Sequence, residues 1–367
     1  MKKRNLLTIS VATMISLSII LFGALSSKSA YAQQEVIRLK FAFYPPAAIP
    51  LGQLLQDFCK DLEQRTGGRL KVDFYGGGSL LKAPEVYEGI VTGITDMAYS
   101  HIEYTSGRFP VTAARQLPLG YPSAWVSNQV ANDFYEKFKP KEWNDVKVLW
   151  MHASPPLLMV TTKPVRKLED LKGMIIRAPG LVGKVVKALG ATPAPTPVME
   201  VYDAMGKGVI QGVYIDYEAL QAFRFAEVAK YITASWQVGN VYAFYIAMNK
   251  NSYNKLPPDI KEIFDKTTGE YREKFALVWN ESEFYGKDAA NKEKAEIIEL
   301  PPDEVVRWQK AVAPVIGDYV DGMVAKGYSE TEVRGWIKFV EDRIAYWTKK
   351  QIDYRILSPT GPAEMQH

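Results

Sequence analysis

The sequence predicts an α/β protein with two lobes, each built on a mostly parallel sheet flanked by helices. Strand and helix patterns alternate along the chain in two separate runs, as is typical of parallel sheets with crossover helices. The chain has 367 residues, and 335 of them follow a leader-like segment of 32. A single core rarely organises a chain of that length, so two lobes are expected.

The first run of alternating patterns begins shortly after the leader. It predicts a strand in "VIRLKFAFY" that ends near Tyr44, and a helix over roughly residues 50–65 that Gly67 and Gly68 close. A second strand is predicted in "RLKVDFYGGG", a helix with Pro84 near its start in "APEVYEGIVTG", and a third strand in "ITDMAYS". The first lobe therefore has the order of a parallel sheet.

The second run follows "KEWNDVKVLWMHASPP". It predicts strands in "LLMVTTK", "GMII" and "VIQGVYI", helices in "LVGKVVKALG", "VMEVYDAMGKG" and "DYEALQAFRFAEVAKY", and a loop in "TPAPTP". Tyr242 and Phe244 lie in a further apolar strand, "VYAFYIAMN", and are expected to fill the core. The remaining chain shows almost only helical patterns, which we expect to brace the outside of both lobes.

Residues 1–32 have the pattern of a cleavable signal peptide. A basic start, "MKKRN", precedes an apolar stretch and the small-residue sequence "SAYA", which ends at Ala32. We therefore expect an exported protein in the periplasm. Cys59 is the only cysteine and lies within a predicted helix, so it is expected to be a buried apolar residue rather than a reactive thiol.

Charge and motifs exclude several classes of function. The leader carries four of the 45 Lys and Arg residues and none of the 41 Asp and Glu, which leaves 41 of each sign afterwards. Nucleic-acid binding therefore has no electrostatic support. The chain contains no G-x-S-x-G, H-E-x-x-H or phosphate-loop motif, so we do not expect an enzyme or a bound cofactor. It has only three histidines, so we do not expect a metal site.

One arginine stands at the end of a strand that is otherwise apolar. Arg177 follows "GMII" and precedes Pro179 and Gly180. Ligands of open α/β sheets bind beyond the carboxyl ends of the strands, and a guanidinium matches a carboxylate with two parallel hydrogen bonds. The sequence alone leaves two alternatives, an ion pair with a nearby acid and a side chain that leaves the sheet into water.

Five ordered segments resemble one protein family. These are "RTGGRLKVDFYGGGSL", "VYEGIVTGITDMAYS", "RKLEDLKGMIIRAPG", "ALGATPAPTPVMEVYDAMGKGVIQG", and "EVAKYIT" followed by "MNKNSYNKLPPDI". Together they are similar to the DctP-type substrate-binding proteins of TRAP transporters, the tripartite ATP-independent periplasmic systems. The resemblance runs from about residue 37 to 265.

The resemblance implies a two-lobed periplasmic binding protein fold with a long helix that spans both lobes. It implies lobe I at residues 33–153 plus about 241–280, lobe II at 154–240 plus about 281–350, and a tail at 351–367. The implied function is to bind an organic acid, most simply a monocarboxylate, and to deliver it to the small and large membrane subunits of the transporter. A monomer is expected, and a partner of a membrane sensor kinase is the alternative function.

The resemblance also implies roles for single residues. Arg177 matches the family arginine that grips the ligand carboxylate. Leu157 stands where many relatives have a second arginine, and Ile215 replaces a common ligand-binding asparagine, so the dicarboxylate and sialic-acid interpretations weaken. A reshaped wall is expected from Tyr214, Tyr217 and Glu218.

Further candidate ligand contacts lie mainly at the ends of predicted strands or between the lobes. They are Tyr44, Ser100, Tyr104, His152, Ser154 and Trp236. Core packing is the alternative for Tyr44, and a structural role is the alternative for His152. Glu218 has an alternative as an ion-pair partner of Arg177, and Arg108 is expected to pair with a nearby carboxylate. The aromatic residues favour a ligand with an apolar or aromatic body.

Overall fold

The computed structural model describes residues 36–366. The signal segment expected at residues 1–32 lies outside the described residues, as does His367. No helix within residues 36–366 has the length and apolarity that a membrane span requires.

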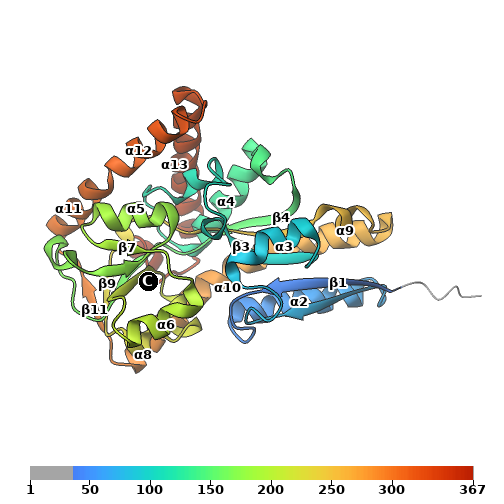
Figure 1. Ribbon diagram of the computed structural model, residues 1–367, viewed down its shortest axis with the longest axis horizontal. Coiled ribbons are helices and arrows are strands. Elements are labelled where there is room, and N and C mark those ends of the chain that lie inside the picture. Colours follow the sequence, from blue (N-terminus) through green and yellow to red (C-terminus); the bar gives the residue numbers. More distant parts are fainter. Residues whose placement is uncertain (1–35, 367) are drawn as a thin grey trace, which may run out of the picture. The chain divides into compact units, whose positions relative to one another are not determined.

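Two mixed sheets carry the strands, as expected for a two-lobed α/β protein (Figure 1). The first sheet has the order β2-β1-β3-β10-β4 and comprises β1 (Ile37–Phe43), β2 (Leu70–Tyr75), β3 (Met97–His101), β4 (Val146–Ala153) and β10 (Ala243–Asn249). The second has the order β11-β9-β5-β8-β6-β7 and comprises β5 (Leu158–Thr161), β6 (Ile175–Arg177), β7 (Thr192–Ala194), β8 (Gly212–Ile215), β9 (Tyr231–Ala234) and β11 (Glu296–Glu299).

Helices connect and cover the strands. Those that precede β10 are α2 (Pro50–Arg65), α3 (Val86–Thr92), α4 (Ala124–Phe138), α5 (Gly180–Ala188), α6 (Val198–Gly206), α7 (Glu218–Ala222) and α8 (Phe225–Val228). Those that follow are α9 (Lys250–Asn254), α10 (Pro258–Lys292), α11 (Pro302–Val312), α12 (Pro314–Val324), α13 (Glu330–Asp353) and α14 (Ala363–Gln366).

Two short segments cross between the sheets, in addition to the later passage through α10, and each short crossing explains an antiparallel strand. The first crossing joins β4 to β5, and the second joins β9 to β10. Both links are too short to hold a crossover helix, which a parallel strand would need. The strand after each link therefore begins next to the other sheet and runs away from that sheet. Accordingly, β5 is antiparallel to β8 and β9, and β10 is antiparallel to β3 and β4.

Hydrogen bonds join the two crossing segments to each other. The amide of Ser154 donates to Tyr242 O at 3.0 Å, and the amide of Leu157 donates to Asn240 O at 3.1 Å. The amide of Tyr242 donates in turn to Ser154 Oγ at 3.0 Å. The crossings therefore form one short two-stranded link. We propose that the lobes meet at this link, with boundaries at residues 153/154 and 240/241.

The long helix α10 packs against elements of both sheets. It contacts α2 and α4 beside the first sheet and α7 beside the second. Gly286 allows the second contact, because a Cβ at this position would collide with the carbonyl of Tyr217. The lobe-spanning helix that the family resemblance implied is therefore present.

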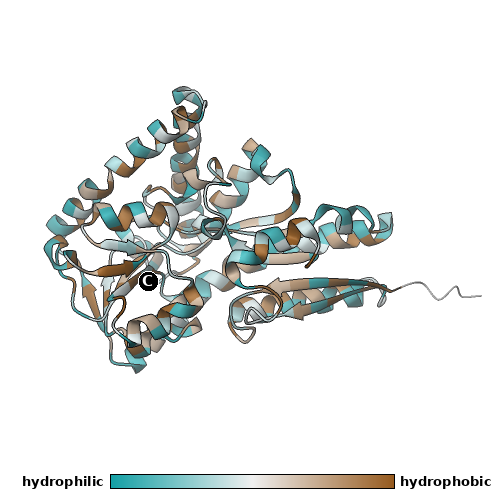
Figure 2. Cartoon of the chain, viewed as in Figure 1, coloured by the Kyte–Doolittle hydropathy of each residue, from teal (hydrophilic) through white to brown (hydrophobic). Residues whose placement is uncertain are grey.

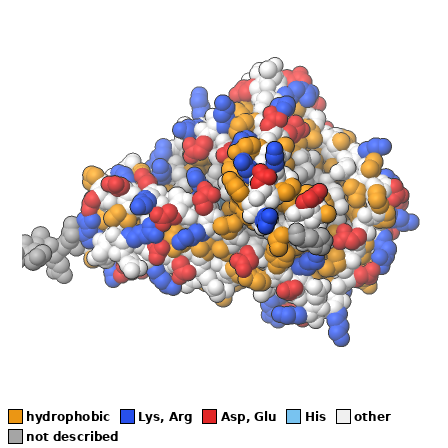
Figure 3. Space-filling view, turned by 180° about the vertical axis from the view of Figure 1, so that it is seen from behind, with side chains coloured by type: hydrophobic (Ala, Val, Ile, Leu, Met, Phe, Trp, Pro, Cys, Tyr) orange, Lys and Arg blue, Asp and Glu red, His pale blue; other side chains and the backbone are white. Residues whose placement is uncertain are grey.

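Apolar residues form the core of each sheet. All seven residues of β10 are buried, and so are all five of β3. Figure 2 shows hydrophobic residues along the strands and hydrophilic residues on the outer turns of the helices. On the face shown in Figure 3, basic and acidic side chains are interspersed, in keeping with the equal numbers of the two kinds after residue 32.

Some elements differ from the sequence prediction. The helix expected after β8 is split into α7 and α8, because Arg224 adopts a left-handed φ of 59° between them. The sequence predicted a loop where β7 lies and a helical region where β11 lies. Both are short edge strands, which carry little periodicity.

One C-terminal helix, α13, lies elsewhere than the implied division of the lobes places it. Residues about 281–350 were expected in lobe II, yet α13 packs on α4 beside the first sheet. Ser123 Oγ there donates to Gln351 Oε1 at 2.5 Å, and Thr360 Oγ1 in the tail donates to Pro122 O at 2.8 Å. The apolar face of α13 packs on the first lobe. Helical periodicity shows which face of a helix is apolar but not which lobe that face contacts.

Candidate ligand-binding site

A cavity of about 40 Å³ lies where the carboxyl ends of strands from both sheets face each other. The second lobe contributes Arg177, Ile215, Asp216 and Glu218, among others, and the first contributes residues of β3, β10 and the loop after β1. Its full lining is Tyr44, Pro45, Ile49, Leu51, Tyr99, His101, Arg177, Val198, Ile215, Asp216, Glu218, Ala219, Phe223, Tyr242, Phe244 and Trp279.

Arg177 brings a buried positive charge to this cavity. Its side chain is 2% exposed, and its Nε donates to the carbonyl of Thr196 at 2.9 Å. Its Nη1 and Nη2 approach the hydroxyls of Tyr242 and Tyr104, at 3.3 and 3.5 Å. A guanidinium has more N–H donors than these three contacts use. Within residues 36–366 no carboxylate lies within ion-pair distance of Arg177, so the alternative of a pair with Glu218 is not realised.

Tyr104 and Tyr242 connect Arg177 to the first lobe. Tyr104 follows β3 in a short 3₁₀ helix, and its hydroxyl accepts a hydrogen bond from the amide of Val198 at 3.1 Å. Tyr242 precedes β10, and its hydroxyl donates to the carbonyl of Tyr214 at 3.1 Å. Both phenols thus reach across to the second lobe. The structure represents an arrangement in which the two lobes touch around the cavity.

Aromatic rings from the first lobe and from α10 form the cavity wall. Tyr44 packs edge-on against Tyr104 with centroids 5.6 Å apart, and Tyr99 packs beside Phe244 at 5.3 Å. Trp279 of α10 meets Phe244 at 5.1 Å. Such rings offer a large apolar surface and, in the tyrosines, a polar tip.

His101 shares this wall as an uncharged side chain. It is 3% exposed, and its Nδ1 accepts a hydrogen bond from the amide of Glu103 at 3.3 Å. Burial and the nearby Arg177 lower the pKa of His101 well below its usual value. Of the residues that the structure describes, Arg177 is therefore the only charged base that lines the cavity.

Carboxyl groups occupy another side of the cavity. Asp216 and Glu218 line it directly, and Glu283 of α10 lies behind them and accepts a hydrogen bond from the amide of Glu218 at 2.7 Å. Burial raises the pKa of Asp216 to about 7. Burial and the Asp216 carboxyl raise the pKa values of Glu218 and Glu283 well above the usual range. Each of these two glutamates keeps one oxygen without a hydrogen-bond partner in the described residues.

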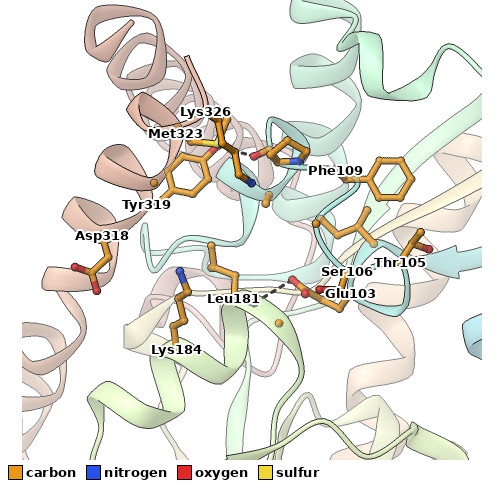
Figure 4. Close-up of a pocket in the computed structure, with 16 residues that line it drawn as sticks. Glu103, Thr105, Ser106, Phe109, Leu181, Lys184, Asp318, Tyr319, Met323 and Lys326 are labelled. Atoms are coloured by element: carbon orange, nitrogen blue, oxygen red, sulfur yellow. Dashed lines mark hydrogen bonds between the residues drawn. The ribbon is translucent and has the colours of Figure 1, made fainter. Parts of the chain in front are cut away.

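A larger groove of about 400 Å³ lies beside the point where Glu103 meets α5 (Figure 4). Glu103 Oε1 accepts a hydrogen bond from the amide of Leu181 at 3.3 Å, in the first turn of that helix. Burial raises the pKa of Glu103 to about 7. The groove also has Lys184 and Lys326 on its walls, but it lacks a buried group of the kind that Arg177 supplies. We therefore place the candidate site at the smaller cavity.

The structure brings four of the predicted residues together. Arg177, Tyr44 and Glu218 line the cavity, and Tyr104 contacts the Arg177 guanidinium. Tyr44 also packs against Tyr99 with ring centroids 5.6 Å apart, which agrees with its alternative of core packing.

Three predicted residues of the first lobe and the link lie elsewhere. Ser100 pairs with Tyr245 across the sheet, on the face opposite to its neighbours Tyr99 and His101, because successive side chains of a strand alternate. His152 is stacked with Tyr99 and Phe244 behind the cavity wall. Ser154 is bonded within the link between the lobes.

Three predicted residues of the second lobe also lie away from the cavity. Tyr214 is buried in β8, where its hydroxyl donates to Asn240 Oδ1 at 2.9 Å. Tyr217 is buried where α10 passes close to its backbone. Trp236 is half-buried in the second crossing and does not line the cavity.

Sequence reasoning missed several lining residues. Tyr242 and Phe244 were expected in the core, because an apolar strand looks the same whether it packs or faces a cleft. His101 and Asp216 lie beside predicted candidates, one position from Ser100 and Tyr217, so the strand ends did point to this region. Trp279 comes from α10, and nothing in its local sequence connects it to the strands.

A second buried arginine, Arg115, was not among the predicted ligand contacts. Arg115 is 1% exposed, and burial lowers its pKa to about 10. Its Nη2 donates to Met151 Sδ at 3.8 Å, and it does not line the cavity. Arg108 forms the expected ion pair, with Asp145. Across residues 36–366, no cluster of three or more metal-ligating side chains is present.

Comparison with known proteins gives a consistent result. The family described as DctP, bacterial extracellular solute-binding protein, family 7, matches residues 41–321. A solute-binding protein of Albidiferax ferrireducens is 27% identical over 318 residues, which are 84% of this chain and 87% of that protein.

Solved structures with the same fold include two TRAP solute-binding proteins. One from Desulfovibrio salexigens is 32% identical, with a TM-score of 0.73 over 86% of this chain and 97% of that one; it is an open complex with the C-terminus of a symmetry mate in its ligand-binding site. One from Rhodoferax ferrireducens is 25% identical, with a TM-score of 0.80 over 86% and 99%, and it holds copurified benzoate. These matches are binding proteins rather than enzymes, and they do not favour the sensor-kinase alternative.

Proposed function

Because the chain belongs to family 7 of the bacterial extracellular solute-binding proteins, we propose that it is the periplasmic receptor of a TRAP transporter for a monocarboxylate with an apolar or aromatic body. The ligand binds between the lobes, with its carboxylate on Arg177. The loaded receptor then delivers it to the small and large membrane subunits of the transporter.

The buried guanidinium of Arg177 is the observation that carries this proposal. A cation that is 2% exposed loses most of its hydration, and hydrogen bonds to phenols and a carbonyl compensate only part of that cost. A ligand carboxylate supplies the missing negative charge and accepts two parallel hydrogen bonds. The apposition of Tyr104 and Tyr242 from the other lobe supports closure around this pair.

The number of charges favours one carboxylate rather than two. Among residues 36–366, Arg177 is the only arginine or lysine that lines the cavity, and Leu157, near the position where many relatives carry a second arginine, is a buried leucine. A second carboxylate placed opposite Arg177 would meet Asp216 and Glu218, which offer it no positive charge. A dicarboxylate thus lacks a second basic partner.

The aromatic wall favours an apolar or aromatic ligand body. Tyr44, Tyr99, Phe244 and Trp279 present ring faces and edges to the cavity. The benzoate in the Rhodoferax ferrireducens structure is an acid of this type bound by a relative. A volume of about 40 Å³ holds only a few water molecules, so a ring enters when the walls or lobes move apart.

The proposal can be tested with the exported protein purified from its native host. Mass spectrometry under native conditions identifies a copurified ligand, and a thermal-shift screen compares matched acids after that ligand is removed by unfolding and refolding. We expect benzoate or short aliphatic monocarboxylates to raise Tm, because a ligand that binds only the folded state stabilises it. Stabilisation by dicarboxylates or uronates alone contradicts the monocarboxylate assignment.

Transport is tested in the host. Deletion of the gene should abolish uptake of the identified acid, and a copy that encodes the full chain should restore it. Uptake that persists at the parental rate contradicts the receptor role even when the purified protein binds the acid.

A further inference from the structure

We propose that the ligand carries an N–H or O–H hydrogen-bond donor away from its carboxylate, and that Glu218 selects for this donor. The inference rests on the proposed function, because it takes the Arg177 end of the cavity as the carboxylate site. It adds a second recognition element, which the apolar wall alone does not provide.

The cavity has two chemically opposite sides. Arg177 offers only donors, whereas Asp216 and Glu218 offer carboxyl oxygens. Arg177 and Asp216 interact electrostatically, because Arg177 lowers the pKa of Asp216 while burial raises it by more. The two side chains nevertheless form no ion pair within residues 36–366. A ligand that separates a carboxylate from a donor matches both sides at once.

Of the carboxyl groups that line the cavity, Glu218 is the one with a buried oxygen that has no hydrogen-bond partner in the described residues. Its side chain is 7% exposed, and its Oε1 is buried without a hydrogen-bond partner within residues 36–366. The neighbouring Asp216 is engaged, because its Oδ1 accepts a hydrogen bond from the amide of Ala219 at 3.2 Å. Buried polar atoms in native proteins nearly always have a partner, so the free capacity of Glu218 points to a group that arrives with the ligand.

The local backbone holds Glu218 in place for this role. Its amide donates to Glu283 Oε1 at 2.7 Å, and Glu283 belongs to α10. The close approach of α10 at Gly286 fixes the segment that carries Glu218 against that helix. The acceptor is therefore presented from a rigid support rather than from a mobile loop.

A site of this kind discriminates against ligands that lack the donor. An apolar group placed against a buried carboxyl leaves the carboxyl unpaired, and that unpaired state is more costly than the loss of a normal hydrogen bond. We expect an acid with a hydroxyl at the correct ring position to bind roughly 10- to 100-fold more tightly than the same acid with a methyl group there.

The test compares pairs of equal size by isothermal titration calorimetry. Each pair consists of a hydroxybenzoate and the benzoate that carries a ring methyl group at the same position, which is either meta or para. The corresponding aminomethylbenzoate is added as a cationic donor. A hydroxyl preference in at least one position is the expected result, and tighter binding of the ammonium than of the hydroxyl identifies a cationic donor.

Two variants assign the preference to Glu218. Glu218→Met has a similar length and no acceptor, so the hydroxyl preference should fall to about one while the methyl acid binds as well as before or better. Glu200→Gln, in the exposed first turn of α6, is the control and should keep the preference. We expect Glu218→Met to fold, because it removes a buried carboxyl group that has no ion-pair partner within residues 36–366 and replaces it with an apolar side chain of similar length.

The outcomes separate the two proposals. If the acids bind and depend on Arg177 but hydroxyl and methyl forms bind equally, the donor inference is wrong and the receptor function stands. A hydroxyl preference that Glu218→Met retains also overturns it. If none of the acids binds, or if Arg177 has no effect on their affinity, the monocarboxylate proposal fails and the donor inference fails with it.

Discussion

Arg177 Nη1 lies 3.3 Å from the hydroxyl of Tyr242, although one residue ends a strand of the second sheet and the other leads into a strand of the first. Arg177 ends β6 in the second sheet, and Tyr242 comes immediately before β10 in the first. The guanidinium therefore points toward the link between the lobes, and its position depends on how the lobes meet.

Substitution of Arg177 should affect binding most strongly. Arg177→Ala leaves the ligand carboxylate buried and unpaired, and we expect a loss of about 3–5 kcal/mol, or two to three decades in Kd. Arg177→Lys should lose much of the same affinity, because an ammonium does not offer two parallel donors. Calorimetry with the copurified acid measures both. Arg166→Ala, which removes an exposed pair with Glu296, is the control and should bind normally.

The hydroxyl of Tyr242 should contribute to binding through Arg177. Tyr242→Phe removes the group that accepts from Arg177 and donates to the Tyr214 carbonyl, so we expect about a tenfold weaker Kd. Tyr245→Phe is a matched control, because Tyr245 lies within β10 opposite Ser100 and does not line the cavity. Equal affinities for the two variants would show that the Tyr242 hydroxyl does not help to position Arg177.

Gly180 should be needed for contact between the lobes. It has a φ of 57°, and a Cβ there would collide with the Glu103 carboxylate. Gly173 has a φ of 81° but no neighbouring atoms, so its substitution has only the backbone cost of about 1 kcal/mol. We expect Gly180→Ala to weaken ligand binding at least tenfold and Gly173→Ala to lower Tm without a change in Kd. Similar Kd values for both variants would exclude a role of this contact in closure.

The stability of the ligand-free protein should fall as the pH rises from 5 to 8. Asp216 has a pKa of about 7 in the folded chain, against an ordinary value near 4, so the folded state holds a proton that the unfolded state has released. A raised carboxyl pKa gives stability that is present at low pH and is lost as the pH passes the folded value. The raised pKa values of Glu218 and Glu283 act in the same direction.

Chemical denaturation at several pH values measures this effect. We expect a decrease on the order of 2–4 kcal/mol between pH 5 and 8, and a smaller slope for Asp216→Asn. The substitution keeps an oxygen for the amide of Ala219. A parental pH dependence that remains in the variant assigns the effect to other groups.

The α/β class and the position of Arg177 were predictable from local patterns. Alternating strands and helices define the class, and a charged residue between an apolar strand and Pro179 marks a strand end. The break at Arg224 was not predictable, because a left-handed residue other than glycine leaves no composition signal.

Most errors at the site came from predicting the wrong face of a strand as the one that lines the cavity. Ser100 was a predicted ligand contact, but the cavity is lined by its neighbours Tyr99 and His101, because successive side chains of a strand point to opposite faces. Which face of β3 lines the cavity depends on where α10 and the second lobe lie. The approach of Glu283 and Trp279 to the segment at residues 216–218 likewise depends on packing between distant parts of the chain.

Cys59 is 5% exposed within α2, and burial raises the pKa of its thiol. As the chain's only sulfhydryl, it should resist maleimide reagents while the protein is folded. Cysteines introduced on the outer surface of each lobe can then be coupled to a pair of fluorophores without first replacing the native one. The wild-type background is therefore suited to spectroscopic observation of single molecules as they open and close.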